Sequence, residues 1–122
     1  MTIKYTKEHE WIKVEGGIAT IGITKHAADA LGELVYVELP EVGVEFSKGD
    51  AFVVVESSKS ASDVYAPIGG VVEAINESLV DTPENVNNSP YDDGWLVKIK
   101  TSEEIDGCMN EEEYQKYLAD SE

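Results

Sequence analysis

The sequence has a single cysteine, few basic residues and no long apolar run. Because Cys108 is alone, an internal disulfide is impossible, and we expect a reducing compartment. No stretch approaches the roughly 20 apolar residues that a membrane-spanning helix needs. The opening MTIKYTKEHEW holds neither an apolar signal core nor an arginine-rich leader, so we expect a cytoplasmic protein.

Positive charge is scarce: the chain has 25 acidic against 9 basic residues and a formal net charge of −16. Such a surface repels nucleic acid phosphates and anionic lipids, so we exclude nucleic acid and membranes as partners. It favours docking onto electropositive surfaces of other proteins.

Histidine is scarce too. His9 and His26 are far apart in the sequence and no Cys/His spacing indicates a metal site, so we assign neither histidine a role.

The remaining composition is that of an ordinary globular protein, with 122 residues, 42% of them hydrophobic and 28% charged. This length suits one domain over residues 1–122, and we expect a monomer. No nucleophile–base pair or phosphate-binding loop is visible, which argues against a catalytic role.

The first part of the chain predicts a hairpin and a helix. Strands are expected at Glu10–Val14 and Ile18–Ile23, joined by paired glycines that supply the positive φ angles of a tight turn. A short helix is expected near residues 25–31, with Thr24 as its N-cap and Gly32 at its end.

Further strands follow. The stretch LVYVELP alternates, which predicts Val35, Val37 and Leu39 on one face. AFVVVE and DVYAPIGGVVEAI, the latter over residues 63–75, read as strands on either side of Lys59, with glycine corners at Gly49 and at Gly69 and Gly70.

The end of the chain predicts a loop, a strand and a helix. Residues 76–94 read as a long loop with at most one helical turn, beginning near Pro83. WLVKIK reads as a final strand with Trp95, Val97 and Ile99 on one face.

A C-terminal helix is expected near residues 110–119. Asn110 is its candidate N-cap, and Tyr114, Tyr117 and Leu118 form a narrow apolar stripe at helical spacing. Many short strands with glycine turns and two small helices predict a mostly β fold, either a sandwich or a flattened barrel.

Lys59 lies alone between two predicted strands, flanked by Ser58 and Ser60. It reads as a solvated turn lysine, a Schiff-base lysine or a target of covalent modification. Schiff-base chemistry needs an apolar or cationic surrounding, and the nearby Glu56 and Asp63 argue against it. An extended hairpin with small flanking residues offers its amine to a modifying enzyme, which favours the third interpretation.

The segment ESSKSASDVYAPIGG resembles the lipoyl-attachment segment of glycine cleavage system H proteins. That segment has Glu three residues before the lysine, here Glu56, and SD followed by P after it. YTKEHEW, ATIGIT, ALGELVYVELPEVG, VNNSPYDDGWLVKIK and the acidic C-terminal helix also fall in the family's order, so the resemblance covers nearly the whole chain. The family usually has Val before the lysine and a small residue after it; Ser58 and Ser60 stand there and keep the tip small. The resemblance implies a flattened barrel-sandwich hybrid of two antiparallel sheets with the lysine hairpin at one end.

The resemblance implies a carrier rather than an enzyme, with (R)-lipoate attached to Lys59 by a lipoate ligase or lipoyl transferase. It implies that a pyridoxal-phosphate-dependent glycine decarboxylase (P protein) loads an aminomethyl group onto the arm. A tetrahydrofolate-dependent aminomethyltransferase (T protein) then takes the one-carbon unit, and dihydrolipoamide dehydrogenase (L protein) reoxidises the dithiol. Tethering keeps the cargo at a high effective concentration between these enzymes.

The loaded arm ends in an amine that is cationic at neutral pH, so a protecting cleft needs a carboxylate. Glu10 in EHEW and Asp63 in SDVYAP match acidic positions of the family pattern, and we predict that they hold the arm. The alternative is that Asp63 only braces the turn and that Glu10 is solvated. Two further functions stay open: a related protein that acts mainly as a lipoyl donor or relay for other enzymes, and an unmodified interaction module.

Overall fold

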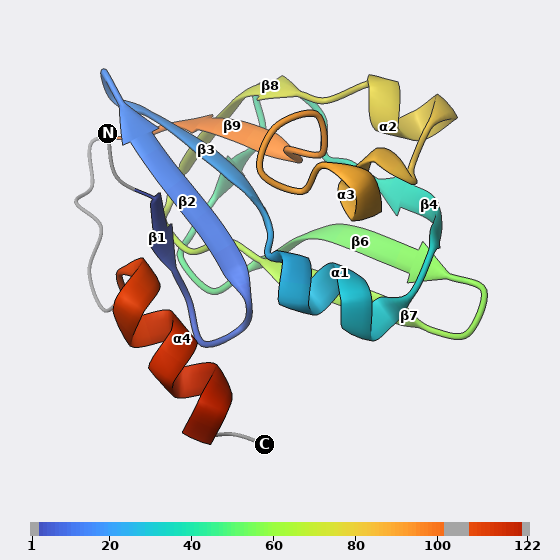
Figure 1. The fold of residues 1–122 in the computed structure, drawn as a ribbon. Helices are drawn as coiled ribbons and strands as arrows, with labels where there is room; N and C mark the ends of the chain where they lie inside the picture. Colours follow the sequence, from blue (N-terminus) through green and yellow to red (C-terminus); the bar gives the residue numbers. More distant parts are fainter. Residues whose placement is uncertain (1–2, 102–107, 121–122) are drawn as a thin grey trace.

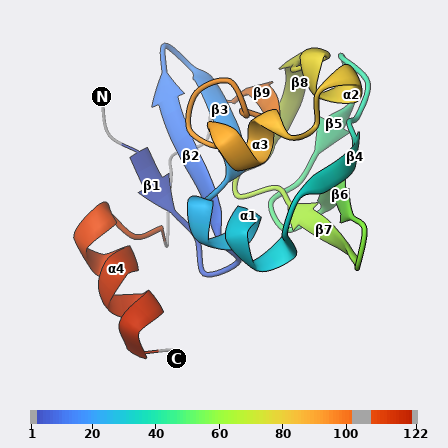
Figure 2. The same cartoon turned by 45° about the vertical axis from the view of Figure 1, so that its right-hand side comes forward.

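The computed structural model describes residues 3–101 and 108–120, which form two antiparallel sheets with helices around them (Figures 1 and 2). One sheet has six strands in the order β1-β2-β3-β9-β8-β5, and the other has three in the order β4-β6-β7. The strands are β1 (Ile3–Tyr5), β2 (Glu10–Glu15), β3 (Ile18–Ile23), β4 (Leu34–Glu38), β5 (Glu45–Phe46), β6 (Ala51–Ser57), β7 (Ala61–Tyr65), β8 (Gly70–Ile75) and β9 (Val97–Lys100). The helices are α1 (Lys25–Leu31), α2 (Ser78–Asp81), α3 (Asn85–Asn88) and α4 (Glu111–Asp120). This arrangement confirms the predicted mostly β fold class.

The β2–β3 hairpin and α1 lie where the sequence predicted them. Both turn glycines have positive φ, 58° at Gly16 and 79° at Gly17. Thr24 caps α1, its hydroxyl accepting a hydrogen bond from the N–H of Ala27 at 3.2 Å. Gly32 ends the helix with a φ of 87°. None of the helices described here is both long enough and apolar enough to cross a membrane.

Trp11 of β2 lies across position 22 of β3. A Cβ atom at Gly22 would stand 2.6 Å from Nε1 of Trp11, so this position has no room for a side chain. The indole is 1% exposed, and its N–H donates to the carbonyl oxygen of Pro90 at 2.9 Å. The hairpin is thereby tied to the loop that precedes β9.

The predicted face of β4 is confirmed at Val37 and is wrong at Val35. Val35 is 56% exposed, whereas Leu34 and Val37 are buried. The pairing of β4 with β6 shifts between Leu34 and Tyr36, which marks a β-bulge. An extra residue at a bulge breaks the alternation of buried and exposed side chains along the strand. The alternating sequence of β4 does not predict where the bulge lies.

The stretch predicted as strand over residues 63–75 forms two strands in different sheets, and the predicted glycine corner at Gly69 and Gly70 lies where the second strand begins. β7 ends at Tyr65 in the three-stranded sheet, and β8 begins at Gly70 in the six-stranded one. Pro67, which has no N–H to donate, lies in the segment that crosses between them. A Cβ atom at Gly70 would collide with the side chain of Ile99 in β9, so glycine lets β8 close against its neighbour.

The segment 76–94 holds two helical turns, α2 and α3, where at most one was predicted near Pro83. Each turn places a side chain in the core: Leu79 and Val86 are both 0% exposed. The buried amide of Asn76 donates from Nδ2 to two backbone carbonyl oxygens at the far end of the segment, each at 2.8 Å. Burial of Leu79 and Val86 in the core therefore stabilises these turns. The helix propensity of the local sequence does not predict them.

The final strand begins at Val97 rather than at Trp95. Val97 and Ile99 are both buried, as predicted, but Trp95 lies before the strand, with Nζ of Lys98 5.1 Å from its ring centroid. Leu96 is 0% exposed, so two consecutive residues are buried at the entry to β9 and the alternation fails there.

The C-terminal helix α4 confirms its predicted position and cap. Oδ1 of Asn110 accepts the N–H of Glu113 at 2.8 Å, and the Glu113 carboxylate accepts the N–H of Asn110 at 3.0 Å. Tyr114, the buried member of the apolar stripe, stacks on Tyr5 of β1 with ring centroids 4.7 Å apart. The helix therefore lies beside the first strand (Figure 1).

Candidate functional site

Lys59 lies at the tip of the β6–β7 hairpin, as predicted (Figure 1). Its side chain is exposed, and it forms no ion pair among the residues that the structure describes. The flanking Ser58 and Ser60 are exposed as well, and Glu56 is half-buried at the end of the hairpin stem. The amine therefore stands on a narrow tip without bulky neighbours.

Ser57 braces this tip, a role that the sequence analysis missed. Its Oγ accepts the N–H of Lys59 at 3.3 Å and the N–H of Ser60 at 3.2 Å. Its own N–H donates to the carbonyl oxygen of Ser60 at 2.8 Å. A serine shortly before an exposed turn residue is the local signal for such a bracing hydroxyl.

A cleft of about 260 Å³ lies between the stem of this hairpin, the β1–β2 loop and α1. The helix and the hairpin lie side by side in both ribbon views (Figures 1 and 2). Glu10 and Asp63 both line the cleft. The apolar part of its lining consists of Ile23, Ala27, Ala30, Leu31, Val55 and Val64. The structure therefore brings the two predicted carboxylates to one cleft with both apolar and polar lining residues.

Glu10 is 3% exposed and is the only buried carboxylate among the described residues. The hydroxyl of Thr6 donates to its Oε1 at 2.9 Å, and the backbone N–H of Tyr65 donates to its Oε2 at 3.1 Å. Neither donor is a cation. Because burial disfavours the charged form, the pKa of Glu10 rises from 4.5 to about 7, despite these two hydrogen bonds.

Asp63 differs from Glu10 in its surroundings. It is exposed, and its Cα lies opposite that of Val54 in the β6–β7 ladder. It borders the cleft from the hairpin side, whereas Glu10 enters from the start of β2. The structure places Glu10 in the dry part of the cleft and Asp63 in contact with solvent.

Two histidines also line the cleft, although the sequence analysis gave them no role. The ring centroids of His9 and His26 are 4.7 Å apart, with the planes tilted by 41°. His9 has a φ of 67°, unusual for a residue with a side chain. Its Nδ1 lies 2.7 Å from the hydroxyl of Tyr114, which in turn lies 2.8 Å from the hydroxyl of Thr24. No spacing in the sequence signals this pair, because the loop and the helix meet only in the fold.

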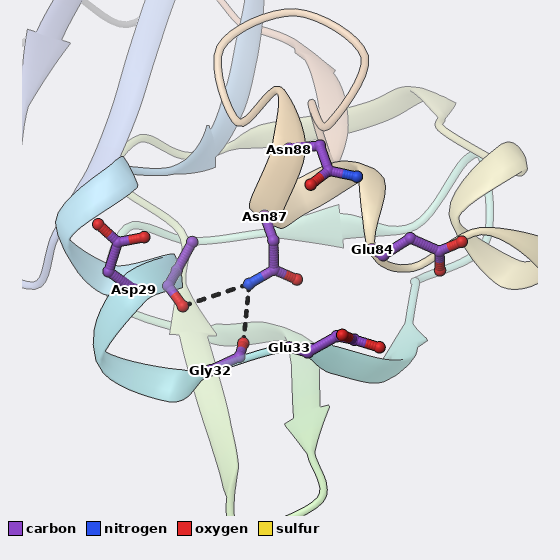
Figure 3. A pocket seen from close by; sticks show the side chains of 7 residues that line it. Asp29, Gly32, Glu33, Glu84, Asn87 and Asn88 are labelled. Carbon is purple, nitrogen blue, oxygen red and sulfur yellow. Dashed lines mark hydrogen bonds between the residues drawn. The ribbon is translucent and has the colours of Figure 1, made fainter.

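A larger hollow of about 500 Å³ lies elsewhere, between α1 and α3 (Figure 3). Its central side chain is Asn87, whose Nδ2 donates to the carbonyl oxygens of Ala28 and Gly32 at 3.3 and 2.8 Å. Its Oδ1 accepts the N–H of Leu34 at 2.9 Å. These bonds satisfy the end of α1, so the polar centre of the hollow belongs to the fold. The cleft at Glu10 is therefore the candidate site.

Comparison with known proteins identifies a family and a fold that match this chain. A family model described as glycine cleavage H-protein matches residues 3–121. A glycine cleavage system H protein of Halothermothrix orenii is 51% identical over 122 residues, which are 98% of this chain and 95% of the relative. One of Alcanivorax borkumensis is 52% identical over 122 residues, which are 98% of this chain and 94% of the relative. The crystal structure of a glycine cleavage system H protein from Mycobacterium marinum matches with a TM-score of 0.90 at 36% identity, covering 97% of each chain.

Proposed function

The chain belongs to the glycine cleavage H-protein family, and on this basis we propose that Lys59 carries its lipoyl group and that the Glu10 cleft shelters the loaded arm. As a member of this family, the protein is a non-catalytic lipoyl carrier of the glycine cleavage system. The observation that carries the proposal is the position of one exposed lysine at a hairpin tip whose stem forms a wall of that cleft.

The tip and the cleft both suit a lipoyl arm. A ligase can close around Lys59 because Ser58 and Ser60 add little bulk and the ladder of β6 and β7 holds the tip in place. The apolar lining suits the hydrocarbon chain of the arm. When attached, the lipoyl group supplies a sulfur that accepts the aminomethyl cargo and a dithiol that is reoxidised afterwards.

Glu10 supplies what a cationic cargo needs. Thr6 and Tyr65 fix the position of the carboxylate without neutralising its charge. An ammonium group entering the cleft would favour the ionised form of Glu10 and gain on the order of 1–3 kcal/mol from a charge-assisted hydrogen bond. Asp63 adds a second negative charge at the solvent side, where screening weakens it.

The same reasoning extends to partners. As a component of the glycine cleavage system the carrier serves several enzymes, and we propose that the decarboxylase, the aminomethyltransferase and the dihydrolipoamide dehydrogenase each receive Lys59 at an electropositive surface. The formal charge of −16 supports this, since opposite charges steer association. A cytoplasmic location is part of the proposal.

Mass spectrometry tests the attachment. In protein from cells that make or take up lipoate, peptide mapping should find one lipoyl adduct, at Lys59, and Lys59→Arg should remove it. The variant should fold normally, because an exposed tip contributes little packing, yet support no glycine cleavage. An adduct at Lys25 or Lys48 with Lys59 bare would refute the assignment, and unmodified protein would indicate an interaction module instead.

A further inference from the structure

His9 and His26 form an imidazole pair on the wall of the cleft. His9 comes from the β1–β2 loop and His26 from the first turn of α1. Both side chains are half-buried. Two imidazoles on one tetrahedral zinc ion have ring centroids on the order of 5 Å apart, because each Zn–N bond is about 2.0–2.1 Å long. The observed separation of 4.7 Å is close to this spacing.

The surroundings of His9 leave one ring nitrogen for the cleft. Its backbone is held by a hydrogen bond from its N–H to Thr6 at 3.1 Å and by one from Thr24 to its carbonyl oxygen at 3.0 Å. Nδ1 is occupied by the hydroxyl of Tyr114 at 2.7 Å, so Nε2 is the nitrogen that remains. Histidines that bind metals typically use one nitrogen for the metal and the other for a hydrogen bond that orients the ring.

The protein by itself does not complete a metal site here. Among the described residues, no group of three or more His, Cys, Asp or Glu side chains is placed to hold a metal ion. A structural zinc site has four ligands, and two imidazoles leave two positions open. The arm proposed above would bring two thiols into this cleft when it is reduced and unloaded. Thiolates together with imidazoles are a ligand set that selects zinc.

We propose that His9, His26 and the two sulfurs of the reduced arm on Lys59 form a tetrahedral site for zinc. This inference rests on the proposed function, since Lys59 must be lipoylated. Binding forms two Zn–N and two Zn–S bonds and releases the two thiol protons to solvent, without change of oxidation state. The oxidised arm has no thiol, and the loaded arm has at most one. Zinc should therefore bind preferentially to the reduced, unloaded carrier. While it is bound, the two thiolates are not free to be reoxidised.

The test uses the lipoylated full chain, with attachment verified by intact mass and the arm reduced by a phosphine. Cobalt(II) serves as the probe, because it replaces zinc and reports thiolate ligands and tetrahedral geometry in its absorption spectrum. One equivalent should bind with thiolate-to-cobalt absorption, and zinc should displace it. His26→Gln, at a half-buried cleft position, should weaken binding by roughly tenfold or more, and Tyr114→Phe by a similar factor through the orientation of His9.

The controls separate the possible explanations. Glu33→Gln, just beyond the end of α1 and outside the cleft, should bind cobalt as native protein does. The oxidised protein and Lys59→Arg should show no thiolate absorption. If lipoylated His26→Gln and His9→Gln bind as tightly as native protein, the dithiol alone holds the metal and this inference is overturned while the proposed function stands. If the native protein carries no lipoyl adduct, the proposed function fails, and this inference with it.

Discussion

The carboxylate of Glu10, in β2, accepts a hydrogen bond from the backbone N–H of Tyr65, in β7, at 3.1 Å. The two residues are 55 positions apart and belong to different sheets. Because a backbone N–H is the donor, this contact does not depend on the side chain at position 65. It joins the start of β2 to the hairpin that carries Lys59, and it holds a buried carboxylate in place before any cargo is present.

We predict that Glu10 makes the stability of the protein depend on pH. Burial raises its pKa from 4.5 to about 7. Between about pH 5 and 7 the unfolded chain loses this proton while the folded protein keeps it. The free energy of unfolding should therefore fall as pH rises through this window, by about 3 kcal/mol, and level off above it. Urea unfolding at a series of pH values measures this.

In Glu10→Gln the free energy of unfolding should depend less on pH between about pH 5 and 7, because the amide has no proton to lose in this window. Glu33→Gln makes the same substitution at an exposed position and should keep the native slope. Burial lowers the pKa of His9, so this residue makes the free energy of unfolding rise with pH. It does so equally in all three proteins. Identical slopes in native protein and Glu10→Gln would show that Glu10 titrates as an exposed carboxylate.

We predict that Glu10 protects the loaded arm more than Asp63 does. Removing the buried charge in Glu10→Gln should speed the release of formaldehyde and ammonia from the loaded carrier, without the transferase, by roughly five- to 150-fold. Asp63→Asn should have a smaller effect, because solvent screens an exposed charge. Release is followed after loading by the decarboxylase and removal of that enzyme.

Lipoylation and reoxidation of the unloaded arm should be nearly unchanged in both variants, since neither step involves the cationic amine. If both variants hold the cargo as long as native protein does, the two carboxylates are structural and the shape of the cleft alone protects the arm.

We predict that docking with the partner enzymes depends steeply on salt. The charge of −16 steers diffusion toward electropositive surfaces, and this steering is screened over a Debye length of about 8 Å at physiological ionic strength. Turnover at subsaturating carrier should fall between low and moderate salt, while turnover at saturating carrier changes less. A flat response at both concentrations would leave shape complementarity as the main determinant of docking.

We predict that Gly22→Ala destabilises the fold. The added methyl group would stand 2.6 Å from Nε1 of Trp11, so the indole or the strand must shift, at a cost of about 1–3 kcal/mol. Urea unfolding gives this difference. In a Trp11→Phe background, where the ring is smaller, the same substitution should cost less. Equal costs in the two backgrounds would mean that Trp11 is not the obstacle.

Features that depend on residues close along the chain could be predicted from the sequence. The glycines at 16 and 17 specify a tight turn, Thr24 caps α1, and the small residues around Lys59 mark an accessible hairpin tip. Each depends on backbone preferences or hydrogen bonds within a few residues, so a local pattern suffices. The acidic positions of Glu10 and Asp63 were also visible in the sequence, but not how their surroundings differ.

The properties of the cleft follow from contacts between elements that are far apart in the sequence. The bulge in β4 and the crossing from β7 to β8 depend on how strands pair across the molecule. Glu10, at the start of β2, is buried where the hairpin stem and α1 pack near it, and the same packing brings His9 next to His26. Burial and desolvation are set by what packs against a group from other elements. The sequence names a carboxylate at position 10, and only the packing around it gives that carboxylate a pKa of about 7.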